Sequence, residues 1–212
     1  MEESTSKEKI LKKVRKALIH KSEQDFSLVD MDADIYPEPS QELEFEFAKE
    51  FTSLNGKFHF CEDESVVGEV LKELIAENGW KNICCFDNTL NQKLVAVGVP
   101  TSNQIDSLPG VDIGITGCEF LIARTGSVMV SSKMASGRRL PFYANYHVVI
   151  AYTSQLVYTV KDALKAMKTR YGNSWPSMFT VITGPSRTAD IEKTLVQGAH
   201  GPKEIFVLLV DQ

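Results

Sequence analysis

Cysteine, long apolar stretches and glycine-rich nucleotide motifs are all scarce in this sequence. Only 4 of its 212 residues are cysteines (Cys61, Cys84, Cys85 and Cys118). None are spaced as C-x-x-C, and no nearby histidines complete a zinc pattern. We therefore expect no structural metal or iron–sulfur cluster held by this chain alone, and we interpret the cysteines as reduced, mostly buried thiols.

The absence of long apolar runs excludes a second group of functions. No run reaches the ~20 residues that a membrane-spanning helix needs, and the charged N-terminus has no signal-peptide core. We expect a cytoplasmic protein without a membrane span. The sequence also lacks both the G-x-x-x-x-G-K-[ST] and the G-x-G-x-x-G patterns, so neither common phosphate-binding loop is present.

Charge is distributed unevenly along the chain. The net charge is −5, but residues 22–48 hold nine acidic residues and no lysine or arginine. The remaining 19 acidic residues face 23 basic ones, a net charge of +4. A mildly basic body is compatible with a small anionic ligand. It is not the clustered basic stripe of a nucleic-acid-binding protein, so we expect no nucleic-acid partner.

The first 40 residues differ in pattern from the rest. Residues 5–20 predict a short amphipathic helix with lysines opposite its apolar positions, and residues 21–40 read as an acidic linker. Residues 41–54 fit either a strand or a helix, and their Glu, Ala and Lys content favours a helix. We therefore predict an N-terminal extension, residues 1–40, followed by one α/β domain, residues 41–212.

Within that domain, apolar segments of strand length alternate with amphipathic segments of helix length. Predicted strands cover 57–61, 82–86, 111–116, 146–152, 156–160, 178–182 and 204–210; predicted helices cover about 66–78, 88–96, 163–171 and 186–197. This order predicts an α/β fold with a mostly parallel sheet sandwiched by helices. Residues 120–123 are predicted as a short helix or turn, and residues 124–132 as an antiparallel hairpin.

Residues 178–192 are the first candidate site. A strand breaks at Gly184-Pro185 and a polar run with Ser, Thr and Arg follows, which we interpret as the start of a helix. Free N–H groups and the helix dipole at such a terminus favour an anion. An ordinary strand–loop–helix connection that binds no ligand gives much the same sequence pattern. The turn at Thr116–Glu119 also follows a buried strand, so both turns are expected to face one cleft.

Two motifs in these segments resemble the LUD domain, the lactate-utilisation protein C family. One runs from Gly184 to Glu192 and continues in Gly198-Ala-His-Gly-Pro202; the other runs from Thr116 to Ser127. The 138–140 and 146–151 segments also fit, so the resemblance covers roughly residues 40–212. Arg124 and Ala199 depart from the residues expected at their positions.

This resemblance implies the fold shared by ribose-5-phosphate isomerase, glucosamine-6-phosphate deaminase and the CoA transferases. It also implies a role in oxidising lactate to pyruvate beside iron–sulfur or FAD-type partner subunits. Cofactors would then reside in those partners and not in this chain. The sequence is compatible with a homo-oligomer as well.

The candidate site residues follow from both arguments. Candidate catalytic residues are Glu119, Asp190 and His200; candidate substrate-binding residues are Thr125, Gly126, Ser127, Arg138, Gly184, Ser186, Arg187 and Thr188; no metal ligands are expected. Each has a structural alternative. Arg187 can pair with Asp190 on the surface, Ser186 and Thr188 can cap a helix, and residues 125–127 can be a plain hairpin turn. His147 begins a buried strand and is expected to be structural.

Two main hypotheses remain open. The domain can bind a small carboxylate or phosphate-bearing metabolite in a cleft and serve lactate oxidation, with its own catalysis undecided. Alternatively, it can be a non-catalytic assembly factor whose N-terminal helix docks redox partner subunits. An isomerase or transferase activity is a third reading that rests on fold analogy alone.

Overall fold

The structure, a computed structural model, describes residues 5–19, 33, 36–103, 110–188, 196–198 and 200–212. It divides into two compact units, Met1–Glu38 and Pro39–Gln212. None of the helices in the described residues is long and apolar enough to cross a membrane.

The first unit contains the helix α1 (Ser6–Ile19), as predicted. Every residue of α1 is at least partly solvent-exposed, and none is buried. Its apolar residues Ile10, Val14 and Leu18 are 62%, 49% and 60% exposed. Isolated helices of this length are marginal in water, so α1 needs a surface on which its apolar face can pack.

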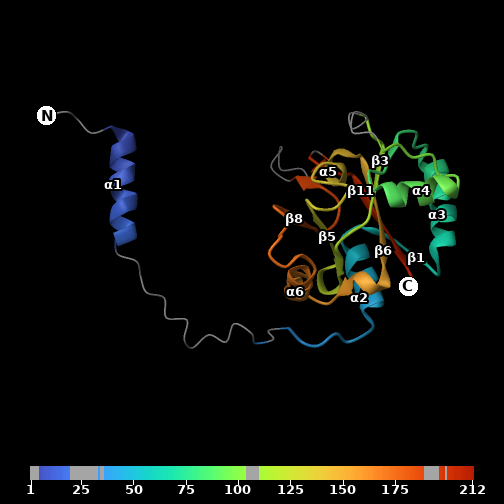
Figure 1. Cartoon of the computed structure of the whole chain (residues 1–212), viewed down its shortest axis with the longest axis horizontal. Coiled ribbons are helices and arrows are strands. Elements are labelled where there is room, and N and C mark those ends of the chain that lie inside the picture. The colour runs from blue at the N-terminus through green and yellow to red at the C-terminus, as the bar shows by residue number, and fades with distance from the viewer. Residues whose placement is uncertain (1–4, 20–32, 34–35, 104–109, 189–195, 199) are drawn as a thin grey trace. The chain divides into compact units, whose positions relative to one another are not determined.

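The second unit is built around two sheets (Figure 1). Its helices are α2 (Leu43–Ser53), α3 (Glu64–Asn78), α4 (Asn88–Ala96), α5 (Leu140–Tyr143) and α6 (Val160–Tyr171), with 3-10 turns η2 (Ala123–Thr125) and η3 (Thr153–Gln155). Its strands are β1 (Lys57–Cys61), β2 (Ile83–Cys84), β3 (Ile113–Thr116), β4 (Phe120–Ile122), β5 (Ser127–Ser131), β6 (Tyr146–Tyr152), β7 (Leu156–Val157), β8 (Phe179–Ile182), β9 (Arg187–Thr188), β10 (Val196–Gln197) and β11 (Glu204–Val210).

The central sheet is parallel, in the order β1-β11-β6-β3-β2. Its middle strands are buried on both faces: on β11, Phe206 and Leu208 belong to one core cluster, and Val207 and Leu209 to the other. This explains why β6 and β11 read as continuous apolar runs.

The two faces of the central sheet are covered differently (Figure 1). Helices α3 and α4 pack on one face, where Leu71 and Leu94 join the core. The other face is covered by α2, through Phe47 and Phe51, and by the second sheet, through Leu121 and Val128. Helix α6 packs on the far side of that second sheet. The predicted α/β fold with a mostly parallel sheet is confirmed.

Three local predictions were wrong. Residues 120–122 form the strand β4, antiparallel to β5, because Phe120, Leu121 and Ile122 are all buried between layers. Strand β8 pairs antiparallel with β5 in the second sheet, in the order β7-β4-β5-β8, and is not part of the parallel sheet.

The third wrong prediction is the helix expected from residue 186. Arg187–Thr188 is instead strand β9, which pairs antiparallel with β10 at Val196–Gln197. Residues 189–195, including Asp190, lie outside the described residues. The helix N-terminus predicted at residues 186–188, which was the basis for the anion site, is therefore not present there.

Candidate functional site

Glu119 is the most deeply buried charged side chain among the predicted site residues that the structure describes. It lies in the short loop between β3 and β4, at the carboxyl end of a strand of the parallel sheet. Its backbone N–H donates to the carbonyl of Met129 at 2.8 Å, and the residue is only 2% exposed. A buried carboxylate needs hydrogen-bond donors and a cation nearby, because its desolvation is costly.

Three side chains supply those donors. The hydroxyls of Ser131 and Tyr171 donate to Oε1 at 2.5 and 2.7 Å, and Arg170 Nη1 donates to Oε2 at 2.6 Å. Ser131 ends β5, while Arg170 and Tyr171 end α6. The Arg170 guanidinium also lies over the Phe120 ring, 4.9 Å from its centroid. Glu119 therefore ties the last turn of α6 to the second sheet.

Two more cations adjoin this carboxylate network. Lys133 Nζ lies 5.2 Å from the centroid of the Tyr171 ring and donates to Ser174 Oγ at 2.5 Å. Arg138 donates to Ser177 Oγ, which lies 3.1 Å from Ser132 Oγ. We call this group the Glu119 cluster; it comprises Glu119, Ser131, Ser132, Lys133, Arg138, Arg170, Tyr171, Ser174 and Ser177.

The Glu119 cluster is suited to an anion from solvent. Its four charged side chains are three cations and one carboxylate, so their sum is +2. Lys133 and Arg138 are exposed, and each keeps N–H donors beyond the one that contacts a serine. The pKa of the Tyr171 phenol is raised, first by burial and then by its hydrogen bond to Glu119, so the phenol stays a proton donor.

Other predicted residues form a second group beside the C-terminal end of α2. The Ser127 hydroxyl lies 2.8 Å from both Thr125 Oγ1 and Thr183 Oγ1. Gly126 has a φ of 54°, and its N–H donates to the Ala123 carbonyl at 3.1 Å. That N–H is therefore already used within the turn, and is not free to cradle an anion.

Gly184 and Arg187 both meet the last turn of α2. A Cβ at Gly184 would lie 3.0 Å from the Leu54 carbonyl oxygen, and φ there is 84°. Arg187 donates to the same oxygen at 2.7 Å. The exposed Arg187 guanidinium thus satisfies one of the carbonyls that the end of a helix leaves unpaired.

The remaining predicted residues lie before β11. The Ser186 N–H donates to the Pro202 carbonyl at 2.9 Å, and Ser186 accepts at its own carbonyl from the Gly198 N–H at 3.0 Å. His200 is exposed in the adjoining turn. Thr188 lies in β9, with only its backbone described, and Asp190 is outside the described residues.

Among the predicted residues that the structure describes, Glu119 and the group around Ser127 therefore do not lie together. Glu119 contacts Ser131 at the end of β5, whereas Thr125 and Thr183 contact Ser127 at its start. The two serines are four positions apart on an extended strand, a separation of about 13 Å. Of the predicted residues, only Glu119 and Arg138 belong to the Glu119 cluster.

Arg170, Tyr171, Lys133 and the serines of the cluster were not predicted. Arg170 and Tyr171 end a predicted helix, and the favourable placement of a cation in a last helical turn gives a sufficient reason for an arginine there. No local pattern pairs that helix end with Glu119, 51 positions earlier.

The described residues contain no group of three or more His, Cys, Asp or Glu side chains arranged to hold a metal ion. All four cysteines are free and buried. Burial raises the pKa of the Cys85 thiol to about 12 and also raises that of Cys118. Both thiols are therefore poor nucleophiles at neutral pH.

His147 is fully buried on β6. Its Nε2 lies 2.9 Å from Thr116 Oγ1, whose hydroxyl donates to the Gly117 carbonyl, so Nε2 carries the proton and donates to Thr116. Its Nδ1 has no hydrogen-bond partner within the described part of the chain. Burial lowers the pKa of His147 to about 3.

This gives a prediction for the pH dependence of stability. Below the ordinary pKa of about 6.5, the unfolded chain binds a proton at this position and the folded protein does not. Stability is therefore lost as pH falls from about 6.5 towards 3, at a limiting rate of about 1.4 kcal/mol per pH unit. Urea unfolding of the wild type and of His147→Gln at pH 6 and pH 5 gives, for each protein, the change in the free energy of unfolding per pH unit; this slope should be steeper for the wild type. Equal slopes would refute the prediction.

Comparison with known proteins identifies relatives of this chain. The family model of the LUD domain matches residues 101–210. An uncharacterized protein of Neisseria meningitidis serogroup B is 30% identical over 155 residues, covering 67% of this chain and 66% of its own length. The lactate utilization protein C of Halalkalibacterium halodurans is 31% identical over 159 residues, covering 70% and 69%. That of Deinococcus radiodurans is 32% identical over 104 residues, covering 49% and 48%.

A solved structure supports the fold. The crystal structure of a DUF162 family protein from Deinococcus radiodurans matches with a TM-score of 0.59 and 17% sequence identity, covering 82% of this chain and 99% of that one. The implied likeness to the sugar-phosphate isomerases and CoA transferases stays a prediction.

Proposed function

Because the chain belongs to the LUD domain family, we propose that it takes part in lactate utilisation, as a subunit or accessory of the oxidation of L-lactate to pyruvate. Relatives named lactate utilization protein C support this role. We further propose that the Glu119 cluster binds a small carboxylate metabolite. The observation that supports carboxylate binding is the positive charge of the cluster: it holds three cations and one buried carboxylate, Glu119, which follows β3.

Each side chain then has a defined task. Glu119 fixes Arg170 and Tyr171 in place, so that these groups are oriented before a ligand arrives. Arg138 offers a planar fork of donors that matches a carboxylate, and Lys133 offers a mobile point charge. Electron transfer would be the work of iron–sulfur or FAD-containing partner subunits; this chain's residues would hold and orient the carboxylate.

The test is a calorimetric titration of the full chain with L-lactate and pyruvate at low salt. We expect the double variant Lys133→Gln/Arg138→Gln to weaken binding at least tenfold, because charge-assisted hydrogen bonds are lost. The neutral analogue lactamide should bind neither protein. Raising the ionic strength should weaken wild-type binding, because both cations are exposed.

Arg187→Gln is the matched control. Arg187 is also an exposed arginine, but it belongs to the second group and contacts the end of α2. We expect it to leave affinity unchanged. Loss of binding in Arg187→Gln with full binding in the double variant would move the site to the loop around Gly184 and Ser186, as the sequence first suggested.

A second candidate function is supported by α1. This helix exposes an apolar face and carries six basic residues (Lys7, Lys9, Lys12, Lys13, Arg15 and Lys16). An assembly factor would use such an element to dock on a redox partner. Co-purification from the native host with and without residues 1–40 tests this alternative. A complex that survives the truncation would show that α1 is not the docking element.

A further inference from the structure

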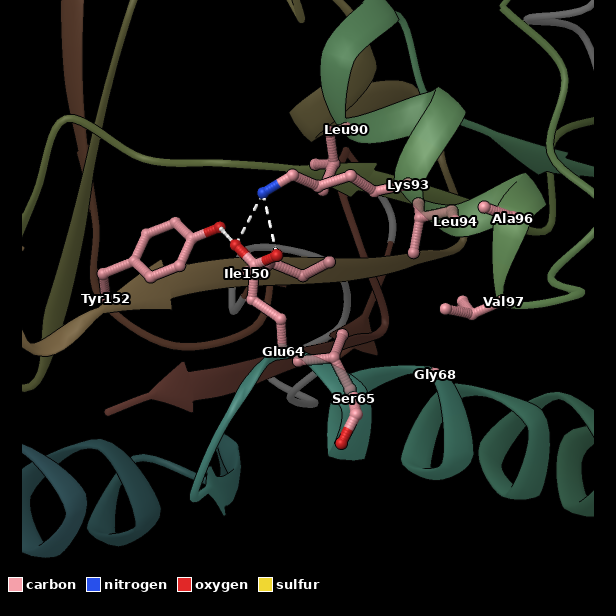
Figure 2. A pocket seen from close by; sticks show the side chains of 11 residues that line it. Glu64, Ser65, Gly68, Leu90, Lys93, Leu94, Ala96, Val97, Ile150 and Tyr152 are labelled. Atoms are coloured by element: carbon pink, nitrogen blue, oxygen red, sulfur yellow. Dashed lines mark hydrogen bonds and ion pairs between the residues drawn. The ribbon is translucent and has the colours of Figure 1, made fainter. Parts of the chain in front are cut away.

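A cavity of about 280 Å³ lies between α3 and α4, above the carboxyl end of β6 (Figure 2). It is separate from the Glu119 cluster and shares no residue with it. Helix α3 contributes one side, including Val67 and Gly68; the other side comes from α4, including Leu90 and Leu94, and from Val97, which follows α4. Because ligands of open α/β sheets bind beyond the carboxyl ends of strands, the position is one where a ligand is expected.

The cavity has an apolar slot. Figure 2 shows Leu94 and Ala96 of α4 and the following Val97 on one side and Gly68 of α3 on the other. A Cβ at Gly68 would lie 2.8 Å from Val97 Cγ2, so α3 and the residue after α4 approach closely at that end of the slot. Apolar walls on two opposite sides leave room for a flat ring between them, and an apolar lining with a few polar groups is typical of small-molecule sites.

The other end of the cavity is polar. Lys93 Nζ donates to Glu64 Oε1 and Oε2 at 2.6 and 2.9 Å, and the Tyr152 hydroxyl donates to Oε1 at 2.8 Å (Figure 2). The pKa of Glu64 is lowered, first by its hydrogen bond to Lys93 and then by that to Tyr152, and the pKa of Lys93 is raised by Glu64. Both groups are therefore charged at neutral pH.

The hydrogen-bond donors and acceptors that remain free on Glu64, Lys93 and Tyr152 indicate which chemical groups a ligand would carry. Oε1 of Glu64 already has two donors, whereas Oε2 has one and can accept another. Lys93 keeps an N–H to donate, and the Tyr152 oxygen can accept. Two adjacent hydroxyl groups on a ligand match this arrangement, because each hydroxyl can both donate and accept a hydrogen bond. A ligand carboxylate would be repelled by Glu64, and a ligand amine by Lys93.

We propose that this cavity binds a nucleoside, with the base in the slot between α3 and α4 and the ribose hydroxyls on Glu64, Lys93 and Tyr152. This site is independent of the carboxylate site at the Glu119 cluster. A free nucleoside and the nucleoside part of a nucleotide present the same chemistry to these residues.

Methyl-detected NMR titration of the full chain with adenosine tests the proposal. We expect saturable shifts at the methyl groups of Val67, Leu90, Leu94 and Ile150, which line the cavity. Removing both hydroxyls, in 2′,3′-dideoxyadenosine, should weaken binding about tenfold or more. A parallel titration with adenosine 5′-phosphate shows whether a nucleotide or the free nucleoside binds more tightly.

The variant Glu64→Gln should lose the discrimination between adenosine and the dideoxy analogue, while Glu69→Gln, an exposed carboxylate on the same helix, should keep it. Tyr152→Phe serves as a second variant, and circular dichroism shows that each is folded. The proposal is overturned if adenosine causes no saturable shifts, if the wild type binds both nucleosides equally, or if Glu64→Gln preserves the discrimination.

Discussion

Gly126→Ala is expected to lower the free energy of unfolding by about 4 kcal/mol, the upper range for a single substitution. A Cβ at this position would lie 2.3 Å from the Phe51 nitrogen and 2.5 Å from the Glu50 carbonyl carbon. Both are backbone atoms of α2, so no side-chain rotation can relieve the clash. Helix α2 must move, and Phe47 and Phe51, both fully buried, must leave their positions in the core.

Gly137→Ala is the matched control for backbone conformation. Gly137 has a φ of 60°, close to the 54° of Gly126, but a Cβ there would have nothing within 4 Å. We expect it to cost only the roughly 1 kcal/mol of placing alanine in the left-handed region. Chemical denaturation of both variants gives the comparison. A similar loss in the free energy of unfolding for both variants would mean that contact with α2 does not make glycine necessary at position 126.

The turn at residues 123–126 therefore has a packing role that its composition does not reveal. A Thr-Gly-Ser sequence suits an anion cradle and a hairpin turn equally well. The close approach of α2, from a segment more than 70 positions earlier, makes glycine necessary here.

Arg170→Met is expected to lower the free energy of unfolding by about 3 kcal/mol at pH 7. The substitution leaves the Glu119 carboxylate, 2% exposed, without its cation, and breaking a buried ion pair from one side typically costs 3–5 kcal/mol. Arg170 is itself 44% exposed, so the lower end of that range applies.

The pair Lys93–Glu64 provides the control for that prediction. Its N–O distance is also 2.6 Å, but the two side chains are 50% and 46% exposed. Lys93→Met should therefore change stability by about 1 kcal/mol or less. If both variants lose the same small amount, Glu119 is not held by Arg170 in the way that its burial and distances indicate.

Much of the fold was predictable where local chemistry and packing agree. Helix α3, predicted at about residues 66–78, is capped at its start by Asp63, which accepts from the N–H groups of Ser65 and Val66, and at its end by Gly79. The apolar runs of β6 and β11 lie in the middle of the parallel sheet. In these elements, periodicity, end signals and burial all favour the same structure.

Strands β4, β8 and β9 were harder to predict because long-range pairing decides them. Phe179–Ile182 looks like a parallel strand, but it pairs with β5, about 50 positions earlier. Arg187–Thr188 reads as a helix start, yet it pairs with Val196–Gln197. Short segments satisfy their backbone groups wherever a partner strand lies, and no local pattern reveals that partner.

In the candidate site, too, some residues are predictable from local sequence and others depend on long-range packing. Glu119 was predictable because it directly follows a buried strand, at the sheet edge where functional groups gather. Its partners Arg170 and Tyr171 reach it only once α6 is packed on the second sheet. The sequence therefore indicates two members of the cluster, Glu119 and Arg138, while the tertiary fold determines the others.

Chemical-shift mapping with L-lactate tests the carboxylate site most directly. Backbone amides of the full chain are followed during titration with L-lactate, with lactamide as the uncharged control. We predict saturable shifts concentrated in residues 131–138 and 170–177, around Lys133, Arg138 and Arg170, and none with lactamide. Saturable shifts confined to residues 125–127 and 183–188, or no saturable shifts at all, would contradict the assignment of the site to the Glu119 cluster.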